Sequence, residues 1–499
     1  MNSTTSYSQN PPDILQNGHS PSSDVPPSFP ASLWKSPTLW RWTGVLVPGM
    51  IAYFLPWGAL TAEQRHLVAF FIATITALVL RPAPMGVVVF LSMTLIALTG
   101  TLPLDVALSG FASGTVWLIF SAFLFAQAVT HTQLGLRIAY FFISRLARTS
   151  LTLGYSIAVS NLVLAPFVPS DTARGGIVAP IVRSLAQVLG SEPGGSAGRA
   201  GSFLMLVGFH TNYVASVMFL TSMVGNPLIA KFAHDIAGVE LTWSRWALAA
   251  CVPAIGSFAF IPWLLYNIHP PQLRQTVHAQ AFAKDKLAAL GPMTRREGTL
   301  LFVLAVVIVG WITSPWHGVG NTAVALTGVC AILLGRVLTW DEILGNARAW
   351  EVLVWFAPLL MMADQLSEQG IIDAIFHGSF SHFRGWPWAF SLAALSVGYF
   401  FVHYGFASLT AQISALYPAF LGAALAAGVP APLAALTLAF LSNLNAGLTH
   451  YGTGSAPVYF AAGYLSQNTW WAVGFVVSLV NLALWLGIGT LWWNSVGLW

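Results

Sequence analysis

Apolar stretches of about 20 residues recur along nearly the whole chain and are separated by short polar segments. About 20 residues of α-helix cross a hydrocarbon core roughly 30 Å thick, so this pattern predicts membrane-spanning helices. Glycine and proline inside the apolar runs suit helices in lipid rather than the strands of a barrel. We expect spans at about residues 39–57, 66–81, 84–100, 113–131, 201–230, 246–266, 298–313, 319–337, 350–366, 433–462 and 470–493.

Two further apolar stretches, residues 151–187 and 387–429, are broken near the middle by polar residues. Each half is short for a core about 30 Å thick at about 1.5 Å of rise per residue. We therefore expect two re-entrant hairpins whose tips meet inside the protein. The predicted fold class is an all-α polytopic membrane protein with about 11 transmembrane helices and two re-entrant hairpins in an inverted repeat.

The domain organisation follows from a likeness between the two halves, in which Ser170 and Ser408, 238 residues apart, take corresponding places. Residues 37–266 form the first predicted repeat, with the inner hairpin, and 298–499 the second, with the outer hairpin. A cytoplasmic arm, 267–297, connects them, and the Ser- and Pro-rich residues 1–36 are expected to be a disordered tail. Inverted repeats place a substrate site near the membrane midplane, where interrupted helices converge.

Composition supports lipid as the solvent, since 56% of the residues are apolar and only 7% are charged. The net charge of +4 does not indicate nucleic acid, because the basic residues lie in loops that the positive-inside rule assigns to the cytoplasm. We expect a multi-pass protein of the cell inner (cytoplasmic) membrane. Cys251 and Cys330 both fall in apolar segments, which argues against a disulfide framework.

The first hairpin tip carries the strongest candidate chemistry, at Ser170, Asp171, Thr172 and Arg174. A helix that begins near Thr172 would point free N–H groups and its positive dipole end at the tip, as an anion site requires. Ordinary N-capping by Ser or Asp is the simpler alternative. Arg174 favours function, because a charged arginine at membrane depth is costly.

The second hairpin tip mirrors the first, with hydroxyls at Ser408 and Thr410 and a nearby His403. Isolated buried histidines are more often packing residues than ligands, but His403 and His450 lie in polar breaks, so we favour a binding role for both.

Two long spans contain further breaks, one with Thr221 and Asn226 before Pro227, the other with the run from Thr449 to Pro457. Glycine and proline there indicate local unwinding, which frees backbone groups for a ligand, and a plain proline kink is the alternative. The candidate residues of the second break are Thr449, His450, Thr453 and Gly454. No closely spaced His, Asp and Glu set and no phosphate-binding loop is visible, so we expect neither a metal enzyme nor an ATP-driven pump.

At residues 169–176, 219–228, 415–421 and 447–460 the sequence resembles the divalent anion–sodium symporter family. The likeness is greatest to its citrate–succinate antiporters and plastid 2-oxoglutarate–malate translocators. The resemblance implies a homodimer in which a mobile transport domain moves against a scaffold by an elevator-type mechanism. It implies Ser-Asn-Thr at both tips, and here Asp171 and Leu409 replace the central Asn.

The resemblance predicts a secondary active transporter of di- or tricarboxylates such as citrate, succinate, malate, 2-oxoglutarate or tartrate, and no enzyme. Arg174 and His403 could replace bound sodium, which favours anion exchange. A sodium-coupled symporter is the alternative, with no cofactor other than sodium. Its candidate ligands are Ser170, Asn226, Ser408 and Asn443. Asp171, if ionised, would repel a dicarboxylate, so it must pair with Arg174, carry a proton or face away.

Overall fold

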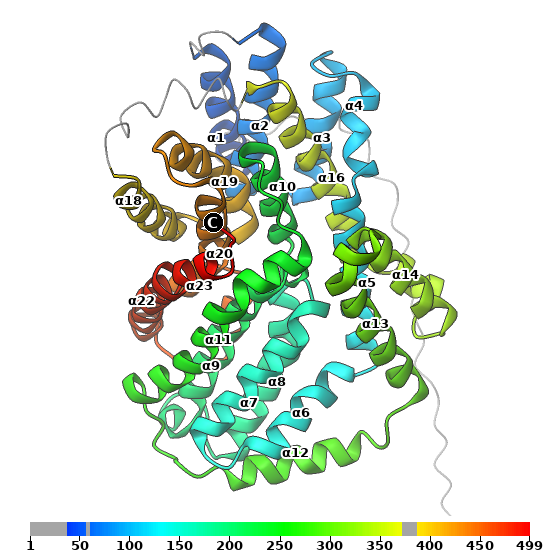
Figure 1. Ribbon diagram of the computed structural model, residues 1–499. Coiled ribbons are helices and arrows are strands. Elements are labelled where there is room, and N and C mark those ends of the chain that lie inside the picture. The colour runs from blue at the N-terminus through cyan, green and yellow to red at the C-terminus, as the bar shows by residue number, and fades with distance from the viewer. Residues whose placement is uncertain (1–36, 56–59, 372–386) are drawn as a thin grey trace, which may run out of the picture.

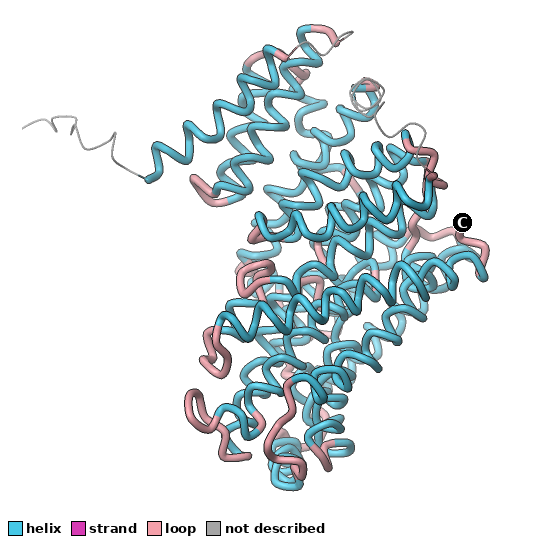
Figure 2. Tube along the Cα trace, turned by 90° about the vertical axis from the view of Figure 1, so that its left-hand side faces the viewer, coloured by secondary structure: helices cyan, strands magenta, loops and turns pink. Residues whose placement is uncertain are grey.

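The computed structural model describes residues 37–55, 60–371 and 387–499, so the expected tail at 1–36 lies outside the described residues. Within those ranges every regular element is a helix, apart from one isolated bridge between Thr149 and Gln275 (Figure 2). The prediction of an all-α chain is confirmed.

The first half of the described chain contains eleven α-helices and begins the connecting arm. These are α1 (Pro37–Phe54), α2 (Ala62–Leu80), α3 (Met85–Leu98), α4 (Leu104–Leu108), α5 (Gly114–His131), α6 (Leu134–Leu146), α7 (Ser150–Leu164), α8 (Asp171–Val188), α9 (Gly201–Met218), α10 (Gly225–Ala237) and α11 (Trp243–Ile268).

The second half repeats much of this order of long and short helices. Its helices are α12 (Val277–Ala289), α13 (Arg295–His317), α14 (Asn321–Leu334), α15 (Trp340–Leu344), α16 (Ala347–Glu368), α18 (Trp388–Phe401), α19 (Leu409–Ala426), α20 (Ala431–Leu444), α21 (Ala456–Phe460), α22 (Gln467–Leu484) and α23 (Thr490–Ser495), with a π-helical turn at Trp485–Gly489.

Nine helical segments of the described chain are long and apolar enough to cross a membrane, and α3 and α14 are shorter apolar helices. Two of the nine, Ser150–Phe167 and Leu409–Ala426, are halves of the expected hairpins. The expected single spans at 201–230 and 433–462 are each broken into two helices by 3₁₀ turns, at Leu220–Ser222 and Asn445–Leu448. The structure therefore agrees with a polytopic membrane fold whose central helices are interrupted.

The helices form an elongated assembly (Figure 1). Helices α1, α2, α3 and α16 gather at one end, while α12 lies across the opposite end against α6 and α8. Helices α7, α8, α9 and α11 pack together as one group, and α18–α20, α22 and α23 lie beside it. Both hairpins thus belong to the part of the fold that contains the interrupted helices.

The interruption in α20 is held by a close approach of backbone to backbone at Gly474 of α22. A Cβ atom at Gly474 would overlap the carbonyl oxygen of Gly447, in the 3₁₀ turn that follows α20. Only glycine lets α22 pack this closely. Because backbone cannot rotate away as a side chain can, a larger residue must displace the whole turn.

We expect Gly474→Ala to lower the free energy of unfolding by roughly 1–3 kcal/mol, the usual cost of overpacking. Thermal unfolding of the detergent-solubilised protein measures this effect. The matched control is Gly256→Ala in α11, where a Cβ meets nothing within 4 Å. Equal melting temperatures for the two variants would contradict the close approach.

Candidate functional site

The two hairpin tips and the two interrupted helices enclose one cavity of about 410 Å³. A cavity of this size suits a small organic molecule. Its lining comes from both tips, from the α9–α10 break and from the segment before α21: Arg81, Pro169, Ser170, Asp171, Thr172, Met223, Val224, Ala407, Ser408, Leu409, Thr410, Tyr451, Thr453, Gly454 and Pro457. The expected meeting of the tips is therefore present, and seven predicted residues line the cavity.

Ser170 and Ser408 cap the helices that begin at the two tips, α8 and α19. Their backbone angles are nearly the same, φ −150° and ψ 121° for Ser170, φ −154° and ψ 125° for Ser408. Each hydroxyl oxygen accepts from the amide three residues on, over 3.2 Å from Ala173 and 3.4 Å from Ala411. Both serines are thus N-caps, and the two helix N-termini face the same cavity, which is the arrangement that an anion site requires.

Asp171 lines the cavity and is only 6% exposed. Its Oδ2 accepts hydrogen bonds from the hydroxyls of Thr453 and, over 2.8 Å, of Ser455, both from the other half of the chain. Among the described residues it forms no ion pair with Arg174. Asp171 therefore does not face away from the cavity. Arg174 is too far for an ion pair with it, but the two side chains still interact through their charges.

Arg174 is fully buried behind the first tip rather than in the cavity wall. Its Nη1 donates to the carbonyls of Val168 (2.6 Å) and Ser222 (2.7 Å). Its Nη2 donates to the carbonyl of Asn212 (3.1 Å) and to the hydroxyl of Ser216, and its Nε donates to Asn212 Oδ1 (3.2 Å). The guanidinium thus ties the tip to α9 and to the 3₁₀ turn of the α9–α10 break, and all its direct partners are neutral oxygen atoms.

His403 occupies a similar place behind the second tip and is also fully buried. Its Nδ1 lies 2.6 Å from Gln412 Oε1, and its Nε2 lies 2.8 Å from the carbonyl oxygen of Gly452. Gln412 Nε2 donates to the Tyr399 carbonyl (2.9 Å), and Asn445 Nδ2 donates to Gln412 Oε1 (2.8 Å). Both ring nitrogens therefore face oxygen acceptors.

Asn226 and Asn443 join the two interrupted helices deep in the protein, and neither lines the cavity. Asn443 Nδ2 donates to Asn226 Oδ1 over 2.8 Å, and Asn226 Nδ2 donates to the carbonyls of Ser216 (2.8 Å) and Phe219 (3.1 Å). This arrangement gives both residues a role in holding the breaks together.

Three other predicted residues lie outside the cavity wall. Thr221 donates to the Pro166 carbonyl and accepts from Trp243, and Thr449 is fully buried. His450 Nδ1 accepts from Trp471 Nε1 over 3.0 Å, and its ring packs on aromatic residues. The simpler reading of an isolated histidine, as a packing residue, describes the surroundings of His450 better than those of His403.

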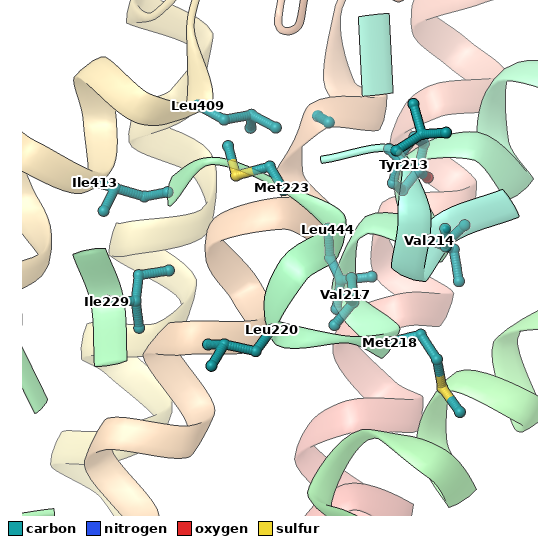
Figure 3. Close-up of a cluster of buried hydrophobic side chains, with 14 of the residues drawn as sticks. Tyr213, Val214, Val217, Met218, Leu220, Met223, Ile229, Leu409, Ile413 and Leu444 are labelled. Carbon is teal, nitrogen blue, oxygen red and sulfur yellow. The ribbon is translucent and has the colours of Figure 1, made fainter. Parts of the chain in front are cut away.

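Leu409 stands where Asp171 stands in the first tip, and it makes that side of the cavity apolar. Figure 3 shows it in a cluster with Met223 and Ile413, close to the α9–α10 break. Leu409 and Met223 both line the cavity. Beside their hydroxyls, the first tip thus adds a carboxylate to the cavity and the second adds a hydrocarbon side chain.

Sequence reasoning missed several residues of the site. Arg81, at the end of α2, reaches the cavity although it is far from every polar break in the sequence. Ser455 lies within the polar run from Thr449 to Pro457 and Asn212 within the predicted span 201–230, but only their contacts with Asp171 and Arg174 distinguish them from their neighbours. Gln412, four residues after Ser408, shares a helix turn with it and could have been found from that spacing.

A site of this kind, enclosed by re-entrant tips and interrupted helices, defines a membrane transporter rather than an enzyme. The sequence model of the sodium:sulfate symporter transmembrane region matches residues 36–499. The chain belongs to this family, that of the divalent anion–sodium symporters, and is a multi-pass membrane transporter.

Relatives match over nearly the full chain. The Bacillus subtilis (strain 168) protein YflS, described as a candidate malate transporter, is 44% identical over 90% of this chain and 95% of its own length. The chloroplastic dicarboxylate transporter 1 of Arabidopsis thaliana is 40% identical over 96% of this chain and 87% of its own length. The inner membrane protein YbhI of Escherichia coli (strain K12) is 36% identical over 92% of this chain and 98% of its own length.

A crystal structure of the Alcanivorax borkumensis YdaH transporter has a similar fold. Its TM-score is 0.50 at 16% sequence identity, over 78% of this chain and 87% of that one. At this identity the likeness concerns the fold alone.

The absence of a side chain at Gly454 lets the segment before α21 approach the first tip. A Cβ at Gly454 would overlap Thr172 Oγ1, so we expect Gly454→Ala to displace the tip and to weaken substrate binding by about tenfold or more. Concentration dependence of uptake into proteoliposomes measures the change. Gly176→Ala, on α8 with nothing within 4 Å of its Cβ, is the control. If the substrate concentration for half-maximal uptake were unchanged in Gly454→Ala, the tip would tolerate the added methyl group and the prediction would be wrong.

Proposed function

We propose that this protein is a secondary active transporter that exchanges di- or tricarboxylate anions without sodium. The observation that carries the proposal is the cavity between α8 and α19, which combines two helix N-termini and four hydroxyls, at Ser170, Thr172, Ser408 and Thr410. Carboxylates bind such donors well. The printed names of relatives, as malate and dicarboxylate transporters, support the same substrate class.

Charge balance favours exchange over symport. Arg174 and His403 supply two positive charges in the proposed exchanger, and each helix N-terminus adds about half a charge. Asp171 offsets one of them, while Arg81 adds a positive charge in the cavity wall, so the empty site keeps a positive potential. A dianion offsets this potential, which lowers the cost of carrying the site through lipid. An empty return is therefore slow, and exchange becomes obligatory.

The surroundings of His403 support its charge. A neutral imidazole has a single N–H group, whereas His403 faces two oxygen acceptors, Gln412 Oε1 and the Gly452 carbonyl. Turning the Gln412 amide around would set its oxygen against the Tyr399 carbonyl. Complete burial opposes the charge, and the two acceptors offset part of that cost when both nitrogens carry protons.

We place the moving part of the carrier in the hairpins and interrupted helices, and the scaffold in α1–α5 and α13–α16 of a homodimer in the cell inner membrane. An elevator-type motion would have to break the contacts between the two parts. One of them is Lys231 of α10, whose Nζ lies 2.8 Å from Asp364 of α16 and 2.7 Å from Asp235. A few such contacts between partly exposed side chains can be exchanged at little net cost.

Sodium-coupled symport is the second candidate, and one observation favours it. Asn443 Oδ1, Asn445 Oδ1 and Thr449 Oγ1 are buried without a hydrogen-bond partner among the described residues, all near the break after α20. Oxygen atoms of this kind could coordinate a sodium ion.

Counterflow in proteoliposomes separates the two candidates. Liposomes preloaded with unlabelled malate should take up labelled malate equally well in sodium and in choline buffers, because the positive charges are built into the protein. Strict dependence on sodium would establish symport and refute the exchange proposal.

Arg174→Gln should reduce uptake by at least about tenfold, because a buried charged hydrogen-bond donor is lost. Gel filtration should still show folded protein. Arg174→Lys keeps the charge but not the planar donor set, so it should retain more uptake than Arg174→Gln. If a folded Arg174→Gln variant transported at the wild-type rate, or if Arg174→Lys were no better, the charge would lie outside the mechanism.

A further inference from the structure

The carboxylate of Asp171 is divided between two surroundings. Oδ2 accepts from the hydroxyls of Thr453 and Ser455, while Oδ1 receives no hydrogen bond from the part of the chain that the structure describes. Oδ1 is not fully buried, and Asp171 lines the cavity, so this oxygen is exposed toward the cavity. One oxygen is thus fixed to the protein and the other is open to the substrate.

Both hydroxyl donors use the same oxygen of Asp171. Thr453 and Ser455 thereby fix Oδ2 and leave Oδ1 as the oxygen that faces the cavity. Asp171 is the first residue of α8, where the helix dipole favours negative charge, and the fixed charge of Arg174 lies one turn on. The neighbourhood of Asp171 is therefore built for an anion.

We propose that Asp171 selects carboxylates that bear a hydroxyl group, and that its Oδ1 accepts a hydrogen bond from this hydroxyl. The inference rests on the proposed carboxylate transport and narrows its substrate class to hydroxy di- and tricarboxylates. A carboxylate or a keto oxygen has no proton to donate, so it cannot hydrogen-bond to Oδ1. The two oxygen atoms would repel each other instead, through like charges or through their lone pairs. A hydroxyl satisfies Oδ1 and separates the two anions.

The apolar second tip supports a fixed orientation of the substrate. Leu409 and Met223 also line the cavity, and they give it an apolar surface that contrasts with Asp171. Leucine has no hydrogen-bonding group in its side chain, and the methionine sulfur is a weak acceptor. The second tip offers hydroxyls at Ser408 and Thr410 but no carboxylate, so the strongest acceptor for the hydroxyl group of the substrate is at the first tip. A site with a buried acceptor rejects the analogue that lacks the donor, because the acceptor is then left unpaired.

Matched pairs of acids test the proposal in proteoliposomes that contain the full chain. Malate and succinate differ by one hydroxyl, as do 2-hydroxyglutarate and glutarate. Each hydroxy acid should inhibit uptake of labelled malate at a concentration about tenfold lower than its parent acid, the value of one charge-assisted hydrogen bond. Equal inhibition within each pair would overturn the proposal while leaving carboxylate transport intact.

Asp171→Asn gives the decisive variant. Thr453 and Ser455 still require an acceptor, so the amide oxygen should take the place of Oδ2 and the Nδ2 group should face the cavity as a donor. The preference for the hydroxy acid should then vanish or reverse. Asp285→Asn, on the exposed surface of α12, is the control and should keep the wild-type ratio.

Ligand-induced shifts in melting temperature provide a second readout that does not depend on transport. The malate-to-succinate ratio from these shifts should change in Asp171→Asn as it does in uptake, even if the variant transports slowly. An equal weakening of both acids would mean that Asp171 only supports the fold of the tip, and this outcome would refute the proposal. Failure of the wild-type protein to bind any of the four acids would instead refute the proposed function.

Discussion

The main physical constraint on this structure is the free-energy cost of placing an anion inside a membrane. A charge at membrane depth needs opposite charge or aligned dipoles nearby, because lipid offers neither. Here the helices that begin at Ser170 and Ser408 turn their free N–H groups toward one cavity, and the re-entrant hairpins exist to bring those two ends together. The breaks in α9–α10 and α20–α21 complete the enclosure with backbone that would be too costly if it faced lipid.

Arg174 stands behind the cavity wall rather than in it. Arg174 is held by three carbonyl oxygens and two side chains of the first tip and the first break. A cation so placed attracts an anion without binding it directly, and it stays fixed when the substrate leaves. The same contacts make the tip and the break one rigid unit. Binding site and moving body are therefore the same set of residues in the proposed mechanism.

The helices and the two hairpin tips could be predicted from the sequence, because both follow from local patterns. Apolar run length predicted the helices, and the polar residues at 169–172 and 407–410 marked breaks that the structure has as helix caps. It could not place Arg81 in the cavity, since that contact depends on how α2 packs against distant helices. Nor could it tell His403 from His450: both lie in polar breaks, but only the first faces two acceptors.

The two halves share a framework, yet they differ where the substrate would lie. Four residues after its capping serine, the first half has Arg174, while the second has Gln412, which holds the charge-bearing candidate His403 instead. One residue after the serine, the halves have Asp171 and Leu409. A site with exact twofold symmetry would bind a symmetric diacid in two equivalent ways. Because the first tip carries a carboxylate where the second carries Leu409, an asymmetric acid would meet different surroundings in its two orientations, and the proposed specificity therefore lies where the two tips differ.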